Sequence, residues 1–137
     1  FDYGNGYSLR GGDEDQAVII SAGRGVYEAL TAATLLEKEG IAAGVIDMPS
    51  FDPKMMAAMA RSGKLVILAE QNNGFLFKKT KETLYGKEEV GHIIALNTLD
   101  SKGERQFIHS ATYDQLLEHF KLSPAAIAQR VQSEFRR

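Results

Sequence analysis

The sequence predicts an α/β domain in which helices cover both faces of a short, mostly parallel sheet. The chain has 137 residues, an ordinary length for one domain with one core. Short apolar runs rich in β-branched residues, such as 17–22, indicate strands buried on both faces. Segments with apolar residues at helical spacing alternate with these runs. Right-handed crossovers between parallel strands place such helices on both faces, so we expect a three-layer α/β/α sandwich.

The first crossover is predicted between residues 17 and 48. Residues 7–10 are expected to form a short strand, and residues 17–22 form the first fully buried one. The helix that follows should end near Gly40, which suits the left-handed conformation just beyond a helix. Residues 41–48 complete the unit as the next strand. The apolar face of the helix is expected to consist of Val26, Ala29, Leu30, Ala33 and Leu36.

The middle of the chain repeats this pattern. Asp52 is predicted to cap a helix whose first position is Pro53. Residues 65–69 form the next buried strand, and residues 75–85 can form a helix. The methionines of the first of these helices are interpreted as flexible core filler, and they are Met55, Met56 and Met59.

The last third of the chain adds one strand and further helices. Residues 91–97 are predicted as a strand, and residues 112–115 fit a capping box ahead of a helix. Ser123 and Pro124 indicate the start of a final helix. One side of that helix is expected to carry Ile127, Val131 and Phe135.

Composition excludes several classes of function. The formal net charge of −2 gives no reason to expect a nucleic-acid partner, and the cluster of Lys78, Lys79 and Lys81 is interpreted as a solvated helix face. The chain has no cysteine, which excludes disulfides, thiolate zinc sites and cysteine nucleophiles and fits a cytoplasmic location. No apolar run approaches the roughly 20 residues that span a bilayer, so no membrane association is expected. The aromatic and glycine-rich residues 1–6 are interpreted as a linker from an upstream region, and residues 7–137 as the domain.

The first candidate binding site is the sequence Gly23-Arg24-Gly25, which opens a predicted helix at a strand end. Backbone N–H groups and the helix dipole would hold an anion there. Asp47 follows at a distance typical of the ribose-binding acid of dinucleotide folds, but Glu28 stands where the third glycine of that motif belongs. The alternative is a glycine-containing turn that lets the helix pack on the sheet.

The second candidate is the polar loop after the strand at 65–69, together with the apolar residue that follows it. Its side chains would bind a polar ligand, hydrogen-bond loop backbone or reach a partner subunit. Phe75 is interpreted either as core or as part of a surface that meets another domain. The residues of this candidate site are Glu70, Asn72, Asn73, Gly74 and Phe75.

The histidines do not form a recognisable site. His92, His109 and His119 lack metal-ligand spacing. His109 and Ser110 invite a hydrolase hypothesis together with Asp114 or Glu70, but no strand–nucleophile–helix elbow surrounds Ser110. The residues themselves therefore predict no catalytic, cofactor-binding or metal-binding residue in this chain.

The order of these segments resembles the transketolase C-terminal domain family, from about Tyr7 to Val131. That family includes transketolase, 1-deoxyxylulose-5-phosphate synthase and the β subunits of 2-oxo acid dehydrogenases. After the strand that ends in glutamate, here Glu70, the family commonly has a glycine-pair loop, whereas residues 72–76 of this chain contain only one glycine, Gly74. The segments that carry the resemblance are 18–30, 35–41, 46–53, 64–70, 109–117 and 122–128.

The resemblance implies a five-stranded sheet whose first strand, at Tyr7, is antiparallel to the rest. It also implies an assembly role. In this family thiamine diphosphate and Mg²⁺ are bound by two preceding domains, and the C-terminal domain braces them and adds to the dimer interface. The expected function is thus an inactive structural part of a homo-oligomeric thiamine-dependent enzyme that transfers two-carbon ketol units between sugar phosphates. The expected partners are the upstream thiamine-binding domains, in the same or a partner chain. The alternative is a stand-alone small-ligand or regulatory module that binds an anion at the Gly23–Gly25 helix start.

Overall fold

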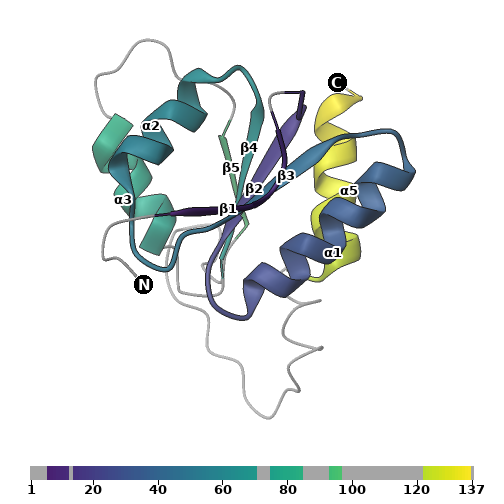
Figure 1. Cartoon of the computed structure of the whole chain (residues 1–137), viewed down its shortest axis with the longest axis horizontal. Coiled ribbons are helices and arrows are strands. Elements are labelled where there is room, and N and C mark those ends of the chain that lie inside the picture. Colours follow the sequence, from purple (N-terminus) through teal and green to yellow (C-terminus); the bar gives the residue numbers. More distant parts are fainter. Residues whose placement is uncertain (1–5, 13, 71–74, 85–92, 97–121, 137) are drawn as a thin grey trace.

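The computed structural model describes residues 6–12, 14–70, 75–84, 93–96 and 122–136, and it shows strands and helices alternating along the chain (Figure 1). The elements are β1 (Tyr7–Arg10), β2 (Ala17–Ser21), α1 (Gly25–Lys38), β3 (Ala43–Asp47), α2 (Pro53–Arg61), β4 (Leu65–Ala69), α3 (Phe75–Leu84), β5 (Ile93–Leu96) and α5 (Pro124–Phe135).

The described strands form one five-stranded sheet in the order β1-β3-β2-β4-β5. β1 pairs antiparallel with β3, and all other neighbours are parallel. In the middle of the sheet Ile19 stands opposite Val45 on one side and Ile67 on the other. This confirms the mostly parallel sheet and its antiparallel first strand.

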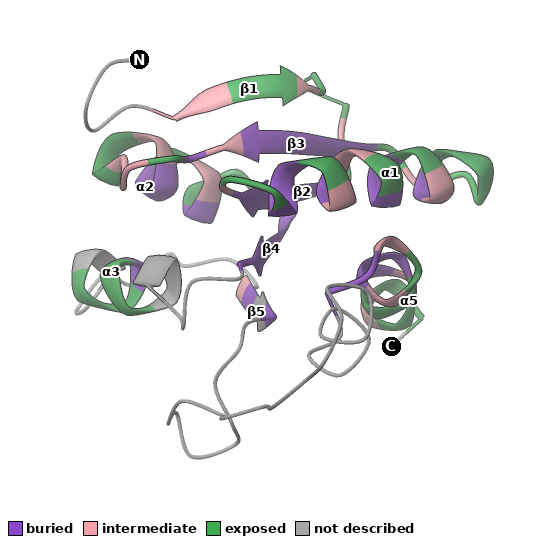
Figure 2. Cartoon of the chain, turned by 90° about the horizontal axis from the view of Figure 1, so that it is seen from below, coloured by how far each residue is buried: buried purple, intermediate pink, exposed green. Residues whose placement is uncertain are grey.

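Helices cover both faces of the sheet, with α1 and α5 on one face and α2 and α3 on the other (Figure 2). Successive side chains of a strand point to opposite faces, so each buried strand feeds two cores. In β2, Ile19 joins the core under α1 and α5, whereas Ile20 joins the core under α2. The three-layer α/β/α sandwich is therefore confirmed.

The carboxyl end of α1 confirms the role predicted for Gly40. This glycine has φ of +80°, and its N–H donates to the carbonyl of Glu37 at 3.0 Å. The N–H of Ile41 reaches back to the carbonyl of Leu36 at 2.9 Å. These two bonds are those of a Schellman motif, and Ile41 also packs on the core that contains Leu36. A left-handed glycine thus turns the chain from α1 toward β3.

Two helix starts follow the predicted capping chemistry. Asp52 Oδ1 accepts a hydrogen bond from the Met55 N–H at 3.0 Å, and Pro53 is the first residue of α2. Ser123 Oγ accepts from the Ala126 N–H at 3.2 Å ahead of Pro124 in α5. The methionines of α2 all belong to or pack against the core on their side of the sheet, which confirms their role as core filler: Met55, Met56 and Met59.

Some sequence expectations differ from the structure in detail. β3 is shorter than the predicted strand at 41–48 because Ile41 is used to end α1. Phe135 is 42% exposed, although it was grouped with the buried Ile127 and Val131, because it is the last residue of α5. Lys78, Lys79 and Lys81 are exposed on α3, as expected.

Several predictions lie outside the described residues. These are the capping box at 112–115, the histidines at 92, 109 and 119, and the loop residues Asn72, Asn73 and Gly74. In the part of the chain that the structure describes, no helix combines the length and the apolar character needed to cross a membrane.

Candidate functional site

The carboxyl ends of the central strands are held together by hydrogen bonds. The N–H of Met48, just after β3, donates to the carbonyl of Ser21 at 2.8 Å. The buried hydroxyl of Ser21 donates to the carbonyl of Ala69 at the end of β4, at 2.5 Å. The N–H of Glu70 donates to the carbonyl of Leu96 at 2.9 Å. One network therefore fixes the ends of β2, β3, β4 and β5 relative to each other.

The strand order creates a switch point at this edge. β2 continues into α1 on one face, whereas its neighbour β4 is followed by α3 on the other face. In sheets of this kind ligands bind outside the carboxyl ends of the strands at such a point. The two predicted sites, one starting at Gly23 and the other at Glu70, therefore follow neighbouring strands at the switch point.

The turn at Gly23–Gly25 is built to start a helix. Gly23 has φ of +61°, a conformation that favours glycine, and a side chain there would meet no atom within 4 Å. The N–H groups of Val26 and Tyr27 donate to the carbonyls of Gly23 and Arg24 at 3.2 and 3.1 Å. These two groups are therefore engaged within the turn.

The charge beside this turn also bears on the anion hypothesis. Arg24 is exposed and would attract an anion, whereas Glu28 lies in the first turn of α1. A carboxylate at a helix start is stabilised by the dipole and competes with an anionic ligand for it. Anion binding at Gly23–Gly25 stays a prediction.

Glu70 is buried, with an exposed fraction of 2%, directly after β4. It takes part in an interaction within the protein, and a buried carboxylate requires a partner. Phe75 is the first residue of α3. Interface and ligand roles for this segment stay predictions.

Asp47 ends β3 beside the switch point. Its Oδ1 atom is buried and has no hydrogen-bond partner in the described part of the chain. Burial raises the pKa of the Asp47 carboxyl because the charged form loses hydration. The other described carboxylates do not supply a metal centre: no group of three His, Cys, Asp or Glu side chains lies together among residues 6–12, 14–70, 75–84, 93–96 and 122–136.

A second feature of the structure is the firm attachment of β1, which carries the incoming chain onto the sheet. At its start, the N–H of Gly6 donates to Asp52 Oδ2 at 2.9 Å. Asp52 Oδ1 meanwhile accepts from the N–H of Met55. One carboxylate therefore caps α2 and holds the entry of the chain.

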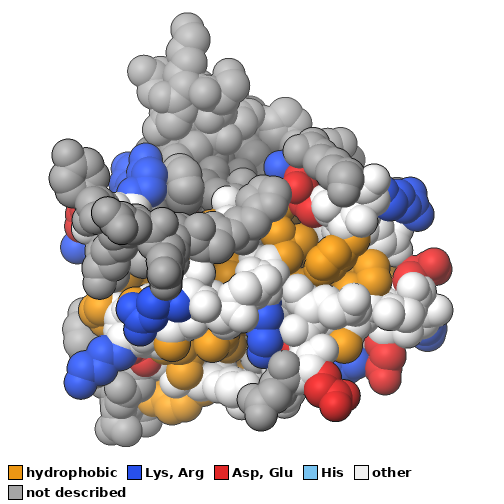
Figure 3. All heavy atoms as spheres, turned by 90° about the horizontal axis from the view of Figure 1, so that it is seen from above, with side chains coloured by type: hydrophobic (Ala, Val, Ile, Leu, Met, Phe, Trp, Pro, Cys, Tyr) orange, Lys and Arg blue, Asp and Glu red, His pale blue; other side chains and the backbone are white. Residues whose placement is uncertain are grey.

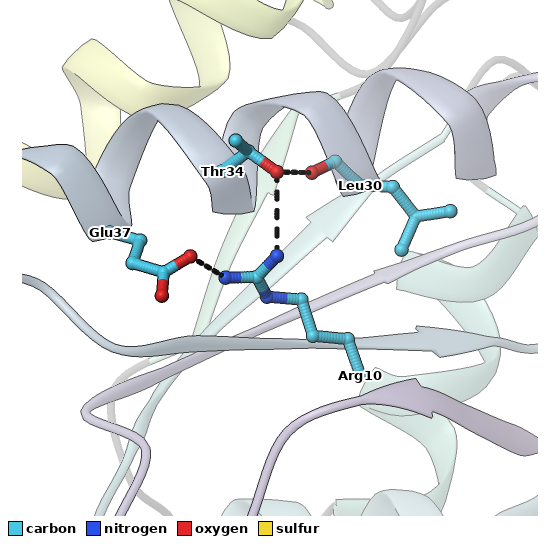
Figure 4. Close-up of polar contacts among 4 residues, drawn as sticks. All are labelled: Arg10, Leu30, Thr34 and Glu37. Atoms are coloured by element: carbon cyan, nitrogen blue, oxygen red, sulfur yellow. Dashed lines mark hydrogen bonds and ion pairs between the residues drawn. The ribbon is translucent and has the colours of Figure 1, made fainter.

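At the other end, Arg10 crosses to α1 on the opposite face (Figure 4). Its guanidinium forms an ion pair with Glu37 and donates to Thr34 Oγ1 at 3.4 Å. Thr34 in turn donates to the carbonyl of Leu30 at 3.2 Å. β1 is thus tied to a helix on each face of the sheet.

Glycine residues allow the chain to turn closely from β1 into β2. A Cβ atom on Gly44 of β3 would lie 2.6 Å from Asp15 Oδ2 and 3.0 Å from the carbonyl oxygen of Arg10. Asp15 Oδ2 accepts from the N–H of Gly12 at 2.9 Å, and Lys64 Nζ donates to the Gly12 carbonyl at 3.0 Å. Figure 3 looks at this amino edge of the sheet, where apolar and charged side chains intermingle.

Sequence reasoning assigned no role to Arg10, Asp15 or Gly44 and only the capping role to Asp52. Gly44 carried the one usable signal, because a glycine inside a strand indicates close approach of another backbone. The contacts of Arg10 and Asp15 depend on side chains that meet only after folding, so spacing along the chain does not reveal them.

The double role of Asp52 leads to a prediction about stability and pH. Burial raises the pKa of this carboxyl, but hydrogen bonds from the N–H groups of Met55, Gly6 and Lys54, with the charge of Lys54, lower it overall below 3.8. Asp52→Ala is expected to reduce the free energy of unfolding at neutral pH by about 1–2 kcal/mol. Because the pKa of Asp52 is lower in the folded state, the ionised carboxylate stabilises the folded protein at pH values above the ordinary pKa. That contribution is lost as the pH falls through the folded-state pKa.

The difference between wild type and Asp52→Ala should therefore shrink as the pH is lowered from 7 toward 3, measured by urea denaturation. Asp52→Asn is the non-titrating comparison: asparagine keeps one acceptor oxygen for the cap, but its NH2 group cannot accept from the N–H of Gly6. The stability difference between Asp52→Asn and Asp52→Ala should therefore not change with pH over this range. A difference that stays constant from pH 7 to pH 3 would argue against this role of the ionised carboxylate.

Comparison with known proteins is consistent with this architecture. The family model for the transketolase C-terminal domain matches residues 6–127. The putative transketolase C-terminal section of Methanocaldococcus jannaschii is 29% identical over 142 residues, which cover 100% of this chain and 42% of that protein. The 1-deoxy-D-xylulose-5-phosphate synthase of Syntrophotalea carbinolica is 28% identical over 135 residues, covering 95% of this chain and 20% of that enzyme.

Solved structures show the same fold. A split-gene transketolase, described as an inactive β4 tetramer, aligns with a TM-score of 0.79 and 28% identity over 97% of this chain and 43% of that chain. Transketolase from Pichia stipitis aligns with a TM-score of 0.68 and 20% identity over 95% of this chain and 18% of that chain. The chain spans less than half the length of these relatives. On the match of its family model, the chain belongs to the transketolase C-terminal domain family.

Proposed function

We propose that this chain is the assembly domain of a thiamine-diphosphate-dependent, transketolase-type enzyme of the cytoplasm that transfers two-carbon ketol units between sugar phosphates. The observation that carries the proposal is the family match over residues 6–127, which begins where the chain enters β1. Two of the similar proteins are called a C-terminal section and a split-gene transketolase, and this chain covers 42% and 43% of them.

The attachment of β1 supports this proposal. A strand that receives the chain from an upstream domain must resist being pulled from the sheet edge. Here Gly6 is bonded to Asp52 on α2, and Arg10 is bonded to Glu37 on α1. Residues 1–6 would then act as the linker, and residues 7–137 as the brace.

The catalytic groups would come from elsewhere in the enzyme. Bound to Mg²⁺, thiamine diphosphate supplies the carbanion chemistry of ketol transfer. Among the described residues, no group of three His, Cys, Asp or Glu side chains lies together. We therefore derive no catalytic step for this chain.

The proposal is tested by isothermal titration of the chain with thiamine diphosphate and Mg²⁺. We expect no micromolar binding to the chain alone, and binding when the upstream thiamine-binding region is supplied. Micromolar binding to this chain alone would overturn the proposed division of labour.

The proposed interface role predicts a specific effect at Tyr27. This side chain is 72% exposed at the start of α1, and an exposed tyrosine is a typical anchor of protein–protein interfaces. Tyr27→Ala should weaken self-association, or association with the upstream domains, by about tenfold or more. Sedimentation velocity over a range of concentrations measures this effect.

Thr31→Ala is the matched control, because Thr31 is exposed one turn further along α1 and its hydroxyl donates to the backbone carbonyl of Tyr27 at 3.1 Å. It should leave association unchanged. Equal association constants for wild type and Tyr27→Ala would show that Tyr27 does not contribute to the interface.

A further inference from the structure

The four methionines of the chain fall into two pairs. Met48 and Met56 are buried, with exposed fractions of 1% and 0%. Met55 and Met59 are half-buried and line an open cavity of about 210 Å³ between α2 and the amino edge of the sheet. Methionine oxidation follows exposure, so these two partly exposed side chains should be oxidised before the two buried ones.

Met55 lies at the point where the chain enters β1. A Cβ atom on Gly6 would be 2.7 Å from Met55 Sδ and 3.5 Å from Ile46 Cγ2 and Met48 Cε. The sulfur therefore packs against the backbone of Gly6, close to Ile46 and Met48. The N–H of Gly6 is bonded to Asp52, whose other carboxylate oxygen accepts from the N–H of Met55 itself.

We propose that Met55 is an oxidation site that controls how firmly β1 is held against α2. Hydrogen peroxide is the oxidant: an S–O bond forms on Met55 Sδ as the O–O bond breaks, and the second oxygen of the peroxide leaves as water. The thioether loses two electrons and the peroxide gains them. The product is polar and chiral, and it replaces the apolar sulfur that packs on Gly6. Burying this dipole beside Ile46 is unfavourable, so the entry of β1 is loosened.

Peroxide treatment followed by tryptic peptide mapping tests the first part. Cleavage after Lys54 and Arg61 places Met55, Met56 and Met59 in one peptide, in which fragment ions assign the added oxygen. We expect Met55 and Met59 to be oxidised at least about fivefold faster than Met56, with Met48 as slow as Met56. Equal rates for Met55 and Met56 would overturn the assignment.

Hydrogen exchange of the oxidised chain tests the second part. Amides of residues 7–10 should exchange about tenfold faster after oxidation, whereas those of β4 should not change. Met55→Leu, which keeps the apolar volume but cannot be oxidised, should abolish the acceleration. Met59→Leu is the control and should retain it. Unchanged exchange at residues 7–10, or acceleration that survives Met55→Leu, would refute control of β1 by Met55. Neither result depends on the proposed role in ketol transfer.

Discussion

Gly44→Ala is expected to reduce the free energy of unfolding by about 3 kcal/mol, the upper part of the usual range for overpacking. The added methyl group would lie 2.6 Å from Asp15 Oδ2 and 3.0 Å from the Arg10 carbonyl oxygen. The Asp15 side chain can rotate away only by giving up its bond to the N–H of Gly12. The Arg10 oxygen belongs to the backbone of β1 and moves only if the strand moves. The expected loss therefore reports how closely β1 is fitted to β3.

Gly12→Ala is the matched control for this prediction. A Cβ atom on Gly12 would meet nothing within 4 Å, and the residue is exposed. Its unfolding free energy should stay within about 0.5 kcal/mol of wild type in urea denaturation. Asp15→Ala added to Gly44→Ala should recover part of the loss, since it removes one of the two clashes. Equal midpoints for Gly44→Ala and wild type would show that β1 adjusts without cost.

Leu36→Ala is expected to reduce the free energy of unfolding by about 2–5 kcal/mol. Leu36 is fully buried, and it belongs to the core that joins α1 to the sheet and to α5. Its carbonyl also accepts the N–H of Ile41 in the motif that ends α1. Truncation leaves a cavity that the rigid helix and sheet fill only in part, so the cost includes lost contacts as well as lost burial.

Leu9→Ala provides the comparison at an exposed site. Leu9 is 49% exposed on β1, so the same change in volume should cost less than about 1 kcal/mol. Urea denaturation of both variants measures the difference. A similar cost for the two leucines would contradict the assignment of the core.

Periodicity and capping chemistry were sufficient to predict most of the fold. The prediction of a strand at residues 65–69 has the bounds that the structure gives it, because the run is apolar throughout and polar residues follow it in the sequence. Asp52, Ser123 and Gly40 marked helix ends correctly because their roles depend on local backbone geometry. The antiparallel β1 came from the resemblance to the family, because a four-residue strand carries too little pattern to show its direction.

The contacts that hold β1 were beyond sequence reasoning. Arg10 meets Glu37 across 27 positions of the chain, and Gly6 meets Asp52 across 46. Such pairs depend on which strand edge faces which helix, and that follows only from the complete strand order. Gly23 and Glu70 follow the carboxyl ends of β2 and β4, as the strand predictions implied, because residues after parallel strands gather at one edge of a sheet. Binding of a ligand or partner by these residues stays a prediction.

The most direct test of the account is two-carbon ketol transfer between sugar phosphates, measured with thiamine diphosphate and Mg²⁺ present. The assay compares this chain alone, the upstream thiamine-binding region alone, and the two together. We predict no turnover by this chain alone and a large gain in turnover when the two are combined. Turnover by this chain on its own, or a combination no more active than the thiamine-binding region, would contradict a bracing role.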